Sequence, residues 1–444
     1  MTPVVPDVFD PRLYARGVPH DRYRTLRDHH PVAWQPEPAV LGWPEGPGFW
    51  AVTRHADVVR VLKDASAYSS HLGATQIRDP DPADLPFIRG MMLNQDPPAH
   101  GRLRRLVSRA FTPRRVAAFE ESVRNRARSL LHKALHDNDN KNENADTDTD
   151  TDPNTVDLVA TVTDDYALLN LADLLGVPES DRALLLHWTR RVIGYQDPDE
   201  AAEAAEAAEA TTATTTPPVN PRSPSALADM FAYAEELTAH KRAHPADDIM
   251  TTLAADPDLT PPERQMFFFL LTIAGNDTVR SAAPGGLALL AESPPAYEQL
   301  RTGKADLTLA LDELLRRHPP VLTFRRTATE DTTLAGAHIK RGDKVVVLHA
   351  SANHDERVFP DPFTLDLART PNPHVSFGDG PHVCLGAHFA RLQLQALYEE
   401  VGRSLPTLTL ASPPKRLVSN FINGIKELRV EPRVRPHPHT PTIR

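Results

Sequence analysis

The chain contains a single cysteine, Cys384, in the stretch "HVSFGDGPHVCLGAHFARLQ" (residues 374–393). One cysteine excludes an internal disulfide and a zinc site built from several thiolates. The thiol lies among three glycines, Gly378, Gly380 and Gly386, just before a helical pattern. A cysteine at the start of a helix has its thiolate favoured by the helix dipole and by unpaired backbone N–H groups. Cys384 is therefore a reactive or metal-ligating thiol or, as is commoner for a lone cysteine, a small buried hydrophobic residue.

Length and charge narrow the class of protein. With 444 residues the chain exceeds the usual size of one hydrophobic core, so two domains or one large helical fold are allowed. The net charge of -10 argues against a general nucleic-acid binder. No apolar run approaches the roughly 20 residues of a membrane span, and the first residues lack a basic region followed by an apolar one. We expect a soluble cytoplasmic protein.

Two stretches are repetitive and nearly devoid of large apolar residues. One covers residues 138–152, rich in Asn, Asp and Thr, and the other covers residues 199–225, with a Glu-Ala repeat followed by a Thr/Pro run. Neither can bury enough apolar surface to offset its ordering entropy. We expect both to be mobile low-complexity insertions in one domain that spans residues 1–444.

The rest of the sequence is mostly helical in pattern, because apolar residues recur at every third and fourth position. The helical segments include residues 121–135, 165–176, 226–243 and 307–318. Strand and turn signals concentrate in two regions, at the start of residues 49–62 and in residues 325–353. The pattern predicts a mainly α protein with small β-sheets, of the α+β class.

The best-marked helix begins in "LTPPERQMFFFLLTIAGNDTVRSAAPGG". Thr260 and Glu263 fit a capping box, and the following residues are apolar on nearly every face, which predicts a core helix. Within it, the polar residues of the segment 274–278 indicate either a functional group or a locally satisfied polar kink. Pro284 and the two glycines after it predict a break in the helix.

Residues 377–386, "FGDGPHVCLG", resemble the haem-thiolate signature of the cytochrome P450 monooxygenases. The resemblance implies the P450 fold, a single helix-rich domain with a β-rich lobe, and haem b as cofactor. It makes Cys384 the axial thiolate, which pushes electron density onto the iron and promotes O–O cleavage. Phe377, Gly378 and Gly386 would surround the haem.

A second motif, Glu313-Leu-Leu-Arg316, resembles the Glu-x-x-Arg helix of the same family. The resemblance implies that this pair locks to a later arginine, best matched by Arg369, and that its role is structural. Taken alone, the pattern is weak, because most such pairs are solvated surface salt bridges.

A third motif, "LNQDPPAHGRLRRLVSRAF", is similar to the family segment that holds a haem propionate. His100 and Arg104 match it, and Arg326 and His382 match the other positions that commonly bind propionates. Buried carboxylates need such cationic or hydrogen-bonding partners. Without the other motifs, His100 and Arg104 would be read as an ordinary exposed helix face.

The central "AGNDT" resembles the stretch where the family activates oxygen. Asp277 and Thr278 are then the acid and alcohol that relay protons, and Gly275 lies beside the haem. Bound dioxygen must receive two protons before its bond breaks, so an acid linked to solvent and a nearby hydroxyl are required. Val279 stands where a second threonine is common, which leaves the helix geometry open.

Family correspondence also indicates the substrate contacts, in the loop from Leu72 to Met92, on the central helix and in two later segments. These contacts are Ile77, Phe87, Met91, Met92, Leu93, Ile273, Ala274, Val321, Leu322, Phe324, Phe421 and Ile422. The set suits an apolar ligand, although each side chain is equally explained as core. Asn420 and Asn423 could add polar contacts.

The substrate class follows from sub-patterns such as "AGNDTVR" and "NFINGIKELRV", which look most like bacterial members that hydroxylate sterols and methyl-branched lipids. Related enzymes of secondary metabolism use the same chemistry for cyclisation, desaturation or coupling, and that alternative stays open. A non-catalytic haem protein that binds a ligand or gas is the other alternative. Asp277 and Thr278 favour an enzyme, because a binding protein needs no proton relay.

The resemblance implies an apolar small-molecule substrate, dioxygen and electrons from NAD(P)H through a ferredoxin reductase and ferredoxin. Arg102, Arg105, Arg109 and Arg391 could form a basic patch for an acidic ferredoxin, or could be ordinary solvated arginines. The stretch 199–225 would lie in the lid loop between the two helices that roof the substrate pocket, as a gate or as an inert spacer.

Overall fold

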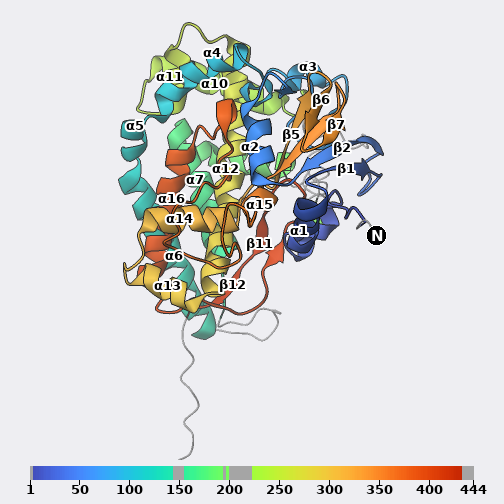
Figure 1. Ribbon diagram of the computed structural model, residues 1–444. Coiled ribbons are helices and arrows are strands. Elements are labelled where there is room, and N and C mark those ends of the chain that lie inside the picture. The colour runs from blue at the N-terminus through green and yellow to red at the C-terminus, as the bar shows by residue number, and fades with distance from the viewer. Residues whose placement is uncertain (1–3, 144–154, 194–196, 200–222, 433–444) are drawn as a thin grey trace, which may run out of the picture.

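The apolar segment that follows Thr260 forms one long helix, α12 (Pro261–Ala291), through the middle of the computed structural model (Figure 1). The predicted capping box is present, because the Glu263 N–H donates to Thr260 Oγ1 (3.4 Å) and the Thr260 N–H donates to Glu263 Oε2 (2.9 Å). The predicted break at Pro284 is wrong, since the helix continues to Ala291.

Packing around the two glycines explains why α12 continues past Pro284. A Cβ atom added at Gly285 would lie 2.0 Å from the His318 ring, and one added at Gly286 would lie 2.1 Å from the Tyr398 hydroxyl. That hydroxyl donates to the carbonyl of Ala282 (3.1 Å). The glycines therefore let side chains of neighbouring elements pack against the helix next to the proline.

The structure describes residues 4–143, 155–193, 197–199 and 223–432. Helices before α12 are α1 (His20–His29), α2 (His55–Lys63), α3 (Leu85–Ile88), α4 (Ala99–Ser108), α5 (Pro113–Ala117), α6 (Glu120–Glu143), α7 (Asp164–Leu175), α8 (Arg182–Ile193), α10 (Ala228–Ala243) and α11 (Ile249–Ala255). Those after it are α13 (Pro294–Arg301), α14 (Leu307–Arg317), α15 (His349–Ala352) and α16 (Ala387–Ser404). Helices α7, α8, α10 and α16 pack against α12.

The main sheet has the strand order β1-β2-β8-β5-β3, and only the β2–β8 pair is parallel. Its strands are β1 (Val32–Glu37), β2 (Gly46–Val52), β3 (Tyr68–Ser69), β5 (Thr323–Ala328) and β8 (Lys344–Leu348). A hairpin of β6 (Thr332–Leu334) and β7 (Ala337–Ile339) lies beside this sheet (Figure 1). Figure 1 shows these strands on one side of the molecule and α6, α7, α12, α14 and α16 on the other, which confirms the helix-rich α+β class.

Further short strands, four of the five near the C-terminus, were not expected from the sequence. They form two small sheets, β4-β12-β9 and β10-β11. Their bounds are β4 (Val156–Asp157), β9 (Thr409–Leu410), β10 (Lys415–Arg416), β11 (Ile425–Glu427) and β12 (Arg429–Glu431). These strands have two or three residues each, too short for a period of two to be recognised in sequence.

The two predicted insertions lie largely outside the described residues. Residues 138–143 continue α6 to Glu143, so the first of these stretches begins as helix, because adding residues to an existing helix costs little. Residues 144–154 and 200–222 are outside the described part of the chain. Within that part, no helix combines the length and the hydropathy that crossing a bilayer requires.

Candidate functional site

The loop before α16 presents Cys384 to a cavity between helices and sheet. The Gly378 N–H donates to the carbonyl of Val375 (2.8 Å), and the Cys384 N–H donates to that of Phe377 (2.8 Å). Gly380 has a φ of 67°, and a Cβ atom there would lie 2.6 Å from the carbonyl oxygen of Leu62, so glycine is required where the loop contacts α2.

The Cys384 thiol is set deep in the protein, yet it is exposed because it faces this cavity. Burial raises the pKa of the thiol, whereas the Gly386 N–H and the positive charges of Arg104 and Arg391 lower it. The net pKa shift is upward, so these groups do not by themselves stabilise a thiolate at neutral pH. A metal cation bound to sulfur would supply the missing stabilisation.

Four arginine and histidine side chains line the same cavity: His100 and Arg104 of α4, Arg326 of β5 and His382 of the cysteine loop. The rings of His100 and His382 lie 4.0 Å apart between centroids. Burial lowers the pKa of Arg326 to about 10, and burial together with the Arg326 charge lowers the pKa of His382 to about 2. Burial and the Arg104 charge also lower the pKa of His100, so both imidazoles are neutral hydrogen-bonding groups at neutral pH.

These four side chains lack an anionic partner within the described chain. Arg326 is 3% exposed and donates to the backbone carbonyl of Arg325 (2.9 Å), but neither Arg326 nor Arg104 forms an ion pair with any described carboxylate. The His100 Nε2 atom is buried without a hydrogen-bond partner there. Buried cationic and polar groups of this kind require a partner, so the cavity is suited to a ligand with carboxylates.

The polar segment of α12 forms a wall of this cavity through Ala274, Gly275 and Thr278. Thr278 Oγ1 donates to the Ala274 carbonyl (2.9 Å). A Cβ atom at Gly275 would lie 2.8 Å from Leu171 Cδ1, so this glycine allows α7 to pack closely against α12. Asp277, which is 3% exposed, lines a second cavity that adjoins the first, and Thr278 lines both.

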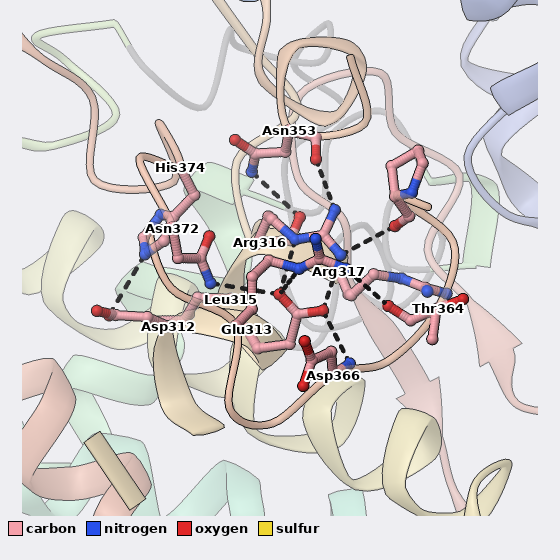
Figure 2. A network of polar contacts seen from close by, with 12 residues as sticks. Asp312, Glu313, Leu315, Arg316, Arg317, Asn353, Thr364, Asp366, Asn372 and His374 are labelled. Atoms are coloured by element: carbon pink, nitrogen blue, oxygen red, sulfur yellow. Dashed lines mark hydrogen bonds and ion pairs between the residues drawn. The ribbon is translucent and has the colours of Figure 1, made fainter. Parts of the chain in front are cut away.

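The predicted contacts of Glu313 with Arg316 and Arg369 are present. Figure 2 shows Glu313 and Arg316 within a network of polar contacts. The Glu313 carboxylate accepts two bonds from Arg316 (2.8 Å each) and one from Arg369 (3.1 Å). Arg316 also donates to the carbonyls of Asn353 (2.7 Å) and Pro362 (2.9 Å). This buried network fastens α14 to the chain that leads into the cysteine loop.

Comparison with known proteins agrees with this geometry. Residues 307–401 match the family model of cytochrome P450. A steroid C26-monooxygenase of Rhodococcus jostii is 34% identical over 435 residues, which cover 96% of this chain and 84% of that protein. A methyl-branched lipid omega-hydroxylase of Mycobacterium bovis is 35% identical over 92% of this chain and 90% of that protein. The chain belongs to the cytochrome P450 family.

Solved P450 structures share the fold over nearly the whole chain. The cytochrome P450 of Mycobacterium marinum in complex with pseudoionone superimposes with a TM-score of 0.77 at 33% identity, covering 94% of this chain and 96% of that one. A cytochrome P450 of Novosphingobium aromaticivorans gives a TM-score of 0.78 at 27% identity, covering 97% and 99%. The predicted P450 fold and monooxygenase class are confirmed.

The thiol cavity of this P450 fits haem. Cys384 would ligate the iron, and His100, Arg104, Arg326 and His382, which have no anionic partner among the described residues, would hold the propionates. A Cβ atom at Gly386 would meet no atom within 4 Å, so the backbone leaves open space on the wall next to the thiol. Apolar surfaces such as Phe377 and Leu271 complete a lining suited to a flat macrocycle.

Arg326→Gln is expected to weaken haem retention about tenfold or more, because it removes the buried guanidinium that has no other anionic partner. The rate of haem transfer to apomyoglobin measures this change. Arg105→Gln, at an exposed position on α4, is the control and should retain haem like the parent. Equal transfer rates in the Arg326 variant and the parent would remove Arg326 from the haem site.

Most predicted substrate contacts lie on one cavity or the other. The contacts that line only the adjoining cavity are Phe87, Met91, Ile273, Phe421 and Ile422. Met92 lines only the thiol cavity. The contacts that line both cavities are Leu93, Ala274, Val321 and Phe324. Ile77 and Leu322 line neither cavity, because both pack in the apolar cluster under the main sheet. Gln76 and Arg78, the neighbours of Ile77, face the adjoining cavity instead.

The two asparagines proposed as polar contacts have structural partners. Asn420 Nδ2 donates to the carbonyl of Phe9 (2.6 Å), and Asn423 Nδ2 donates to that of Pro319 (3.2 Å). Neither residue lines a described cavity. The polar lining that sequence reasoning missed is the charged segment 76–81, and the density of Arg and Asp in "QIRDPDPAD" is the signal that could have indicated it.

The arginines of the predicted basic patch differ in their surroundings. Arg102 pairs with Glu263, and Arg391 pairs with Asp312 (2.7 Å). Arg109 has a looser pair with Asp256 (3.8 Å) and a side chain that is 71% exposed. Arg105 is also exposed and, with Arg109, borders a hollow next to the cysteine loop. The patch is therefore smaller than the sequence suggested.

Proposed function

We propose that this P450 hydroxylates a bulky, largely apolar small molecule of the sterol or branched-lipid type. The observation that carries the proposal is the apolar cavity next to the thiol cavity, which shares with it a wall formed by Leu93, Leu270, Ala274, Thr278, Val321 and Phe324. A substrate in the adjoining cavity would therefore present a C–H bond to the haem cavity. The names of the steroid and lipid relatives support the same class.

Haem, when bound, supplies the chemistry that inserts one atom of dioxygen into the C–H bond and releases the other as water. The side chains of this chain would orient the substrate and exclude bulk water from the shared wall. Thr278 lies on that wall, where its Oγ1 donates to the Ala274 carbonyl (2.9 Å), and this hydroxyl would hold and pass on protons next to the haem cavity. The Asp277 carboxylate, one residue earlier, would replenish the proton.

Thr278→Ala is expected to leave haem content and substrate affinity nearly unchanged but to divert most reducing equivalents to peroxide. The hydroxyl that manages proton delivery is lost, whereas no ligand of iron is removed and the apolar loss is a single methyl group. Asp277→Asn should mainly slow turnover, by about tenfold or more. Product formed per NAD(P)H oxidised, together with peroxide release, measures both effects. Unchanged coupling in both variants would contradict a proton relay at these residues.

We also propose that electrons come from NAD(P)H through a ferredoxin reductase and ferredoxin, and that the enzyme works in the cytoplasm. The exposed Arg105 and Arg109, next to the cysteine loop, support docking of an acidic protein on that face. This interaction would weaken steeply with ionic strength.

The test of the proposed function is a screen of sterols, branched lipids, terpenoids, polyketides and aromatic alkaloids for a low-to-high-spin shift of the Soret band. Compounds that bind are then incubated with NAD(P)H, reductase and ferredoxin, and products are identified. A hydroxylated apolar product supports the proposal. Binding without substrate-dependent NAD(P)H use would indicate a haem protein that only binds ligands, and a cyclised, desaturated or coupled product would indicate a tailoring enzyme.

A further inference from the structure

The adjoining cavity, where we propose that the substrate binds and which is called the substrate cavity below, has charged side chains on a part of its wall. That part is not shared with the thiol cavity. Arg78, Asp79 and Asp81 line the substrate cavity but not the thiol cavity. The shared wall, in contrast, contains only apolar side chains and the Thr278 hydroxyl. An elongated molecule with its reacting carbon at the shared wall would therefore place its other end near these charges.

Arg78 and Asp81 make their contacts outside the main sheet, and the further charged residue of this cavity, Asp277, lies on α12. The Arg78 guanidinium donates to the carbonyl of Pro44 (2.9 Å) and lies over the rings of Phe9 and Trp43, at 5.3 and 5.5 Å from their centroids. Asp81 Oδ1 accepts from the Ala83 N–H (2.8 Å) within its own turn.

Asp79 differs because two cationic side chains of the main sheet bind its carboxylate. Its Oδ1 accepts from Arg325 Nη1 of β5 (2.5 Å), and its Oδ2 pairs with Lys344 Nζ of β8 (2.7 Å). The side chains of Arg325 and Lys344 are 5% and 3% exposed, whereas that of Asp79 is 47% exposed. The carboxylate is thus fixed on its buried side and accessible on the side of the cavity.

The charges of this group balance. Lys344 Nζ also pairs with the buried Glu37 carboxylate (2.7 Å), so two cations face two carboxylates. Partial burial raises the pKa of Asp79, but the combined effect of Arg325 and Lys344 is larger and opposite. The net shift of this pKa is therefore downward. Asp79 is therefore ionised at neutral pH and can only accept hydrogen bonds. A carboxylate has about four acceptor positions, so two remain for a ligand.

We propose that Asp79 binds a hydroxyl or amine donor at the end of the substrate remote from the oxidised carbon. This inference rests on the proposed function. The substrate class is then an elongated apolar molecule with a neutral or cationic donor at one end. A carboxylate at that end would be repelled by Asp79 and Asp81, while Arg78 already donates to a backbone carbonyl.

The test compares probes that differ only in the donor: cholesterol with its methyl ether, and farnesol with its methyl ether. Dissociation constants come from Soret spin-shift titrations of the haem-loaded parent, Asp79→Ala and Asp81→Ala. Where the parent binds a pair of probes, we expect the alcohol to bind about tenfold or more tightly than its methyl ether. The reason is that a hydrogen bond to a charged acceptor is strong. Asp79→Ala should reduce this ratio to near one, and Asp81→Ala, which removes the same charge from the same wall, should keep it.

A retained ether affinity and carbon monoxide spectrum show that Asp79→Ala has not disturbed the fold. If that variant fails to fold, Asp79→Asn, which keeps the side-chain volume, should lower the ratio severalfold. A ratio near one in the parent, or an unchanged ratio in the folded Asp79 variant, overturns the inference while the proposed function stands. If no apolar compound of the wider screen shifts the Soret band, the proposed substrate class fails, and this inference fails with it.

Discussion

Replacing Cys384 by serine is expected to abolish the red-shifted Soret band of the ferrous carbon monoxide complex and to remove monooxygenase turnover. Cys384 is the only cysteine in the chain, so no other thiol can take its place. A serine hydroxyl stays protonated at neutral pH and cannot push electron density onto iron as a thiolate does. A difference spectrum of the reduced protein with and without carbon monoxide measures the change.

Val383→Ala is the matched control for this prediction. Val383 is the preceding residue, lines the same cavity and is 40% exposed, but it has no ligating atom. The control should keep the red-shifted band. A red-shifted band that persists in Cys384→Ser would show that the thiol is not the ligand.

The parts of this site that could be predicted from sequence are those carried by short motifs. The cysteine loop, the Glu313–Arg316 pair and the polar segment of α12 each lie within a few consecutive residues, so residue type and spacing identify them. Arg369 lies 53 residues after Arg316, and only the family resemblance connected the two. The structure brings them to the same carboxylate.

The parts that could not be predicted depend on packing between distant segments. The Asp79 network joins residues of β1, the loop after β3, β5 and β8, and no local pattern relates these positions. The continuity of α12 past Pro284 likewise depends on His318 and Tyr398, which fill the space beside Gly285 and Gly286. Local propensity predicts a break there, and tertiary contacts override it.

The direction in which a side chain points could also not be predicted from the sequence. Ile77 and Leu322 are apolar, as a substrate contact should be, but they face the apolar cluster under the sheet. Val321, next to Leu322, faces the cavities. A one-residue difference thus decides between core and pocket, and composition does not contain that information.

Glu313→Gln is expected to destabilise the protein by about 3–5 kcal/mol, because it leaves two buried guanidinium groups without their counter-charge. Glu313 and Arg316 are fully buried, and Arg369 is 9% exposed. The same carboxylate accepts the Asp366 N–H (3.1 Å), so the change also loosens the segment that leads to the cysteine loop. The midpoint of urea unfolding, followed by the Soret band and by far-ultraviolet circular dichroism, measures the loss.

The chain supplies a matched control with the same spacing, Glu298-Gln-Leu-Arg301 on α13. Its ion pair has a similar distance (2.8 Å), but the side chains of Glu298 and Arg301 are 53% and 33% exposed. Solvent screens an exposed pair and hydrates each partner when the other is removed, so Glu298→Gln should leave the midpoint unchanged within error. Equal midpoints in both variants would show that burial of the Glu313 network contributes nothing to stability. A loss confined to Glu313→Gln would establish that the same four-residue pattern is structural only where the fold removes it from water.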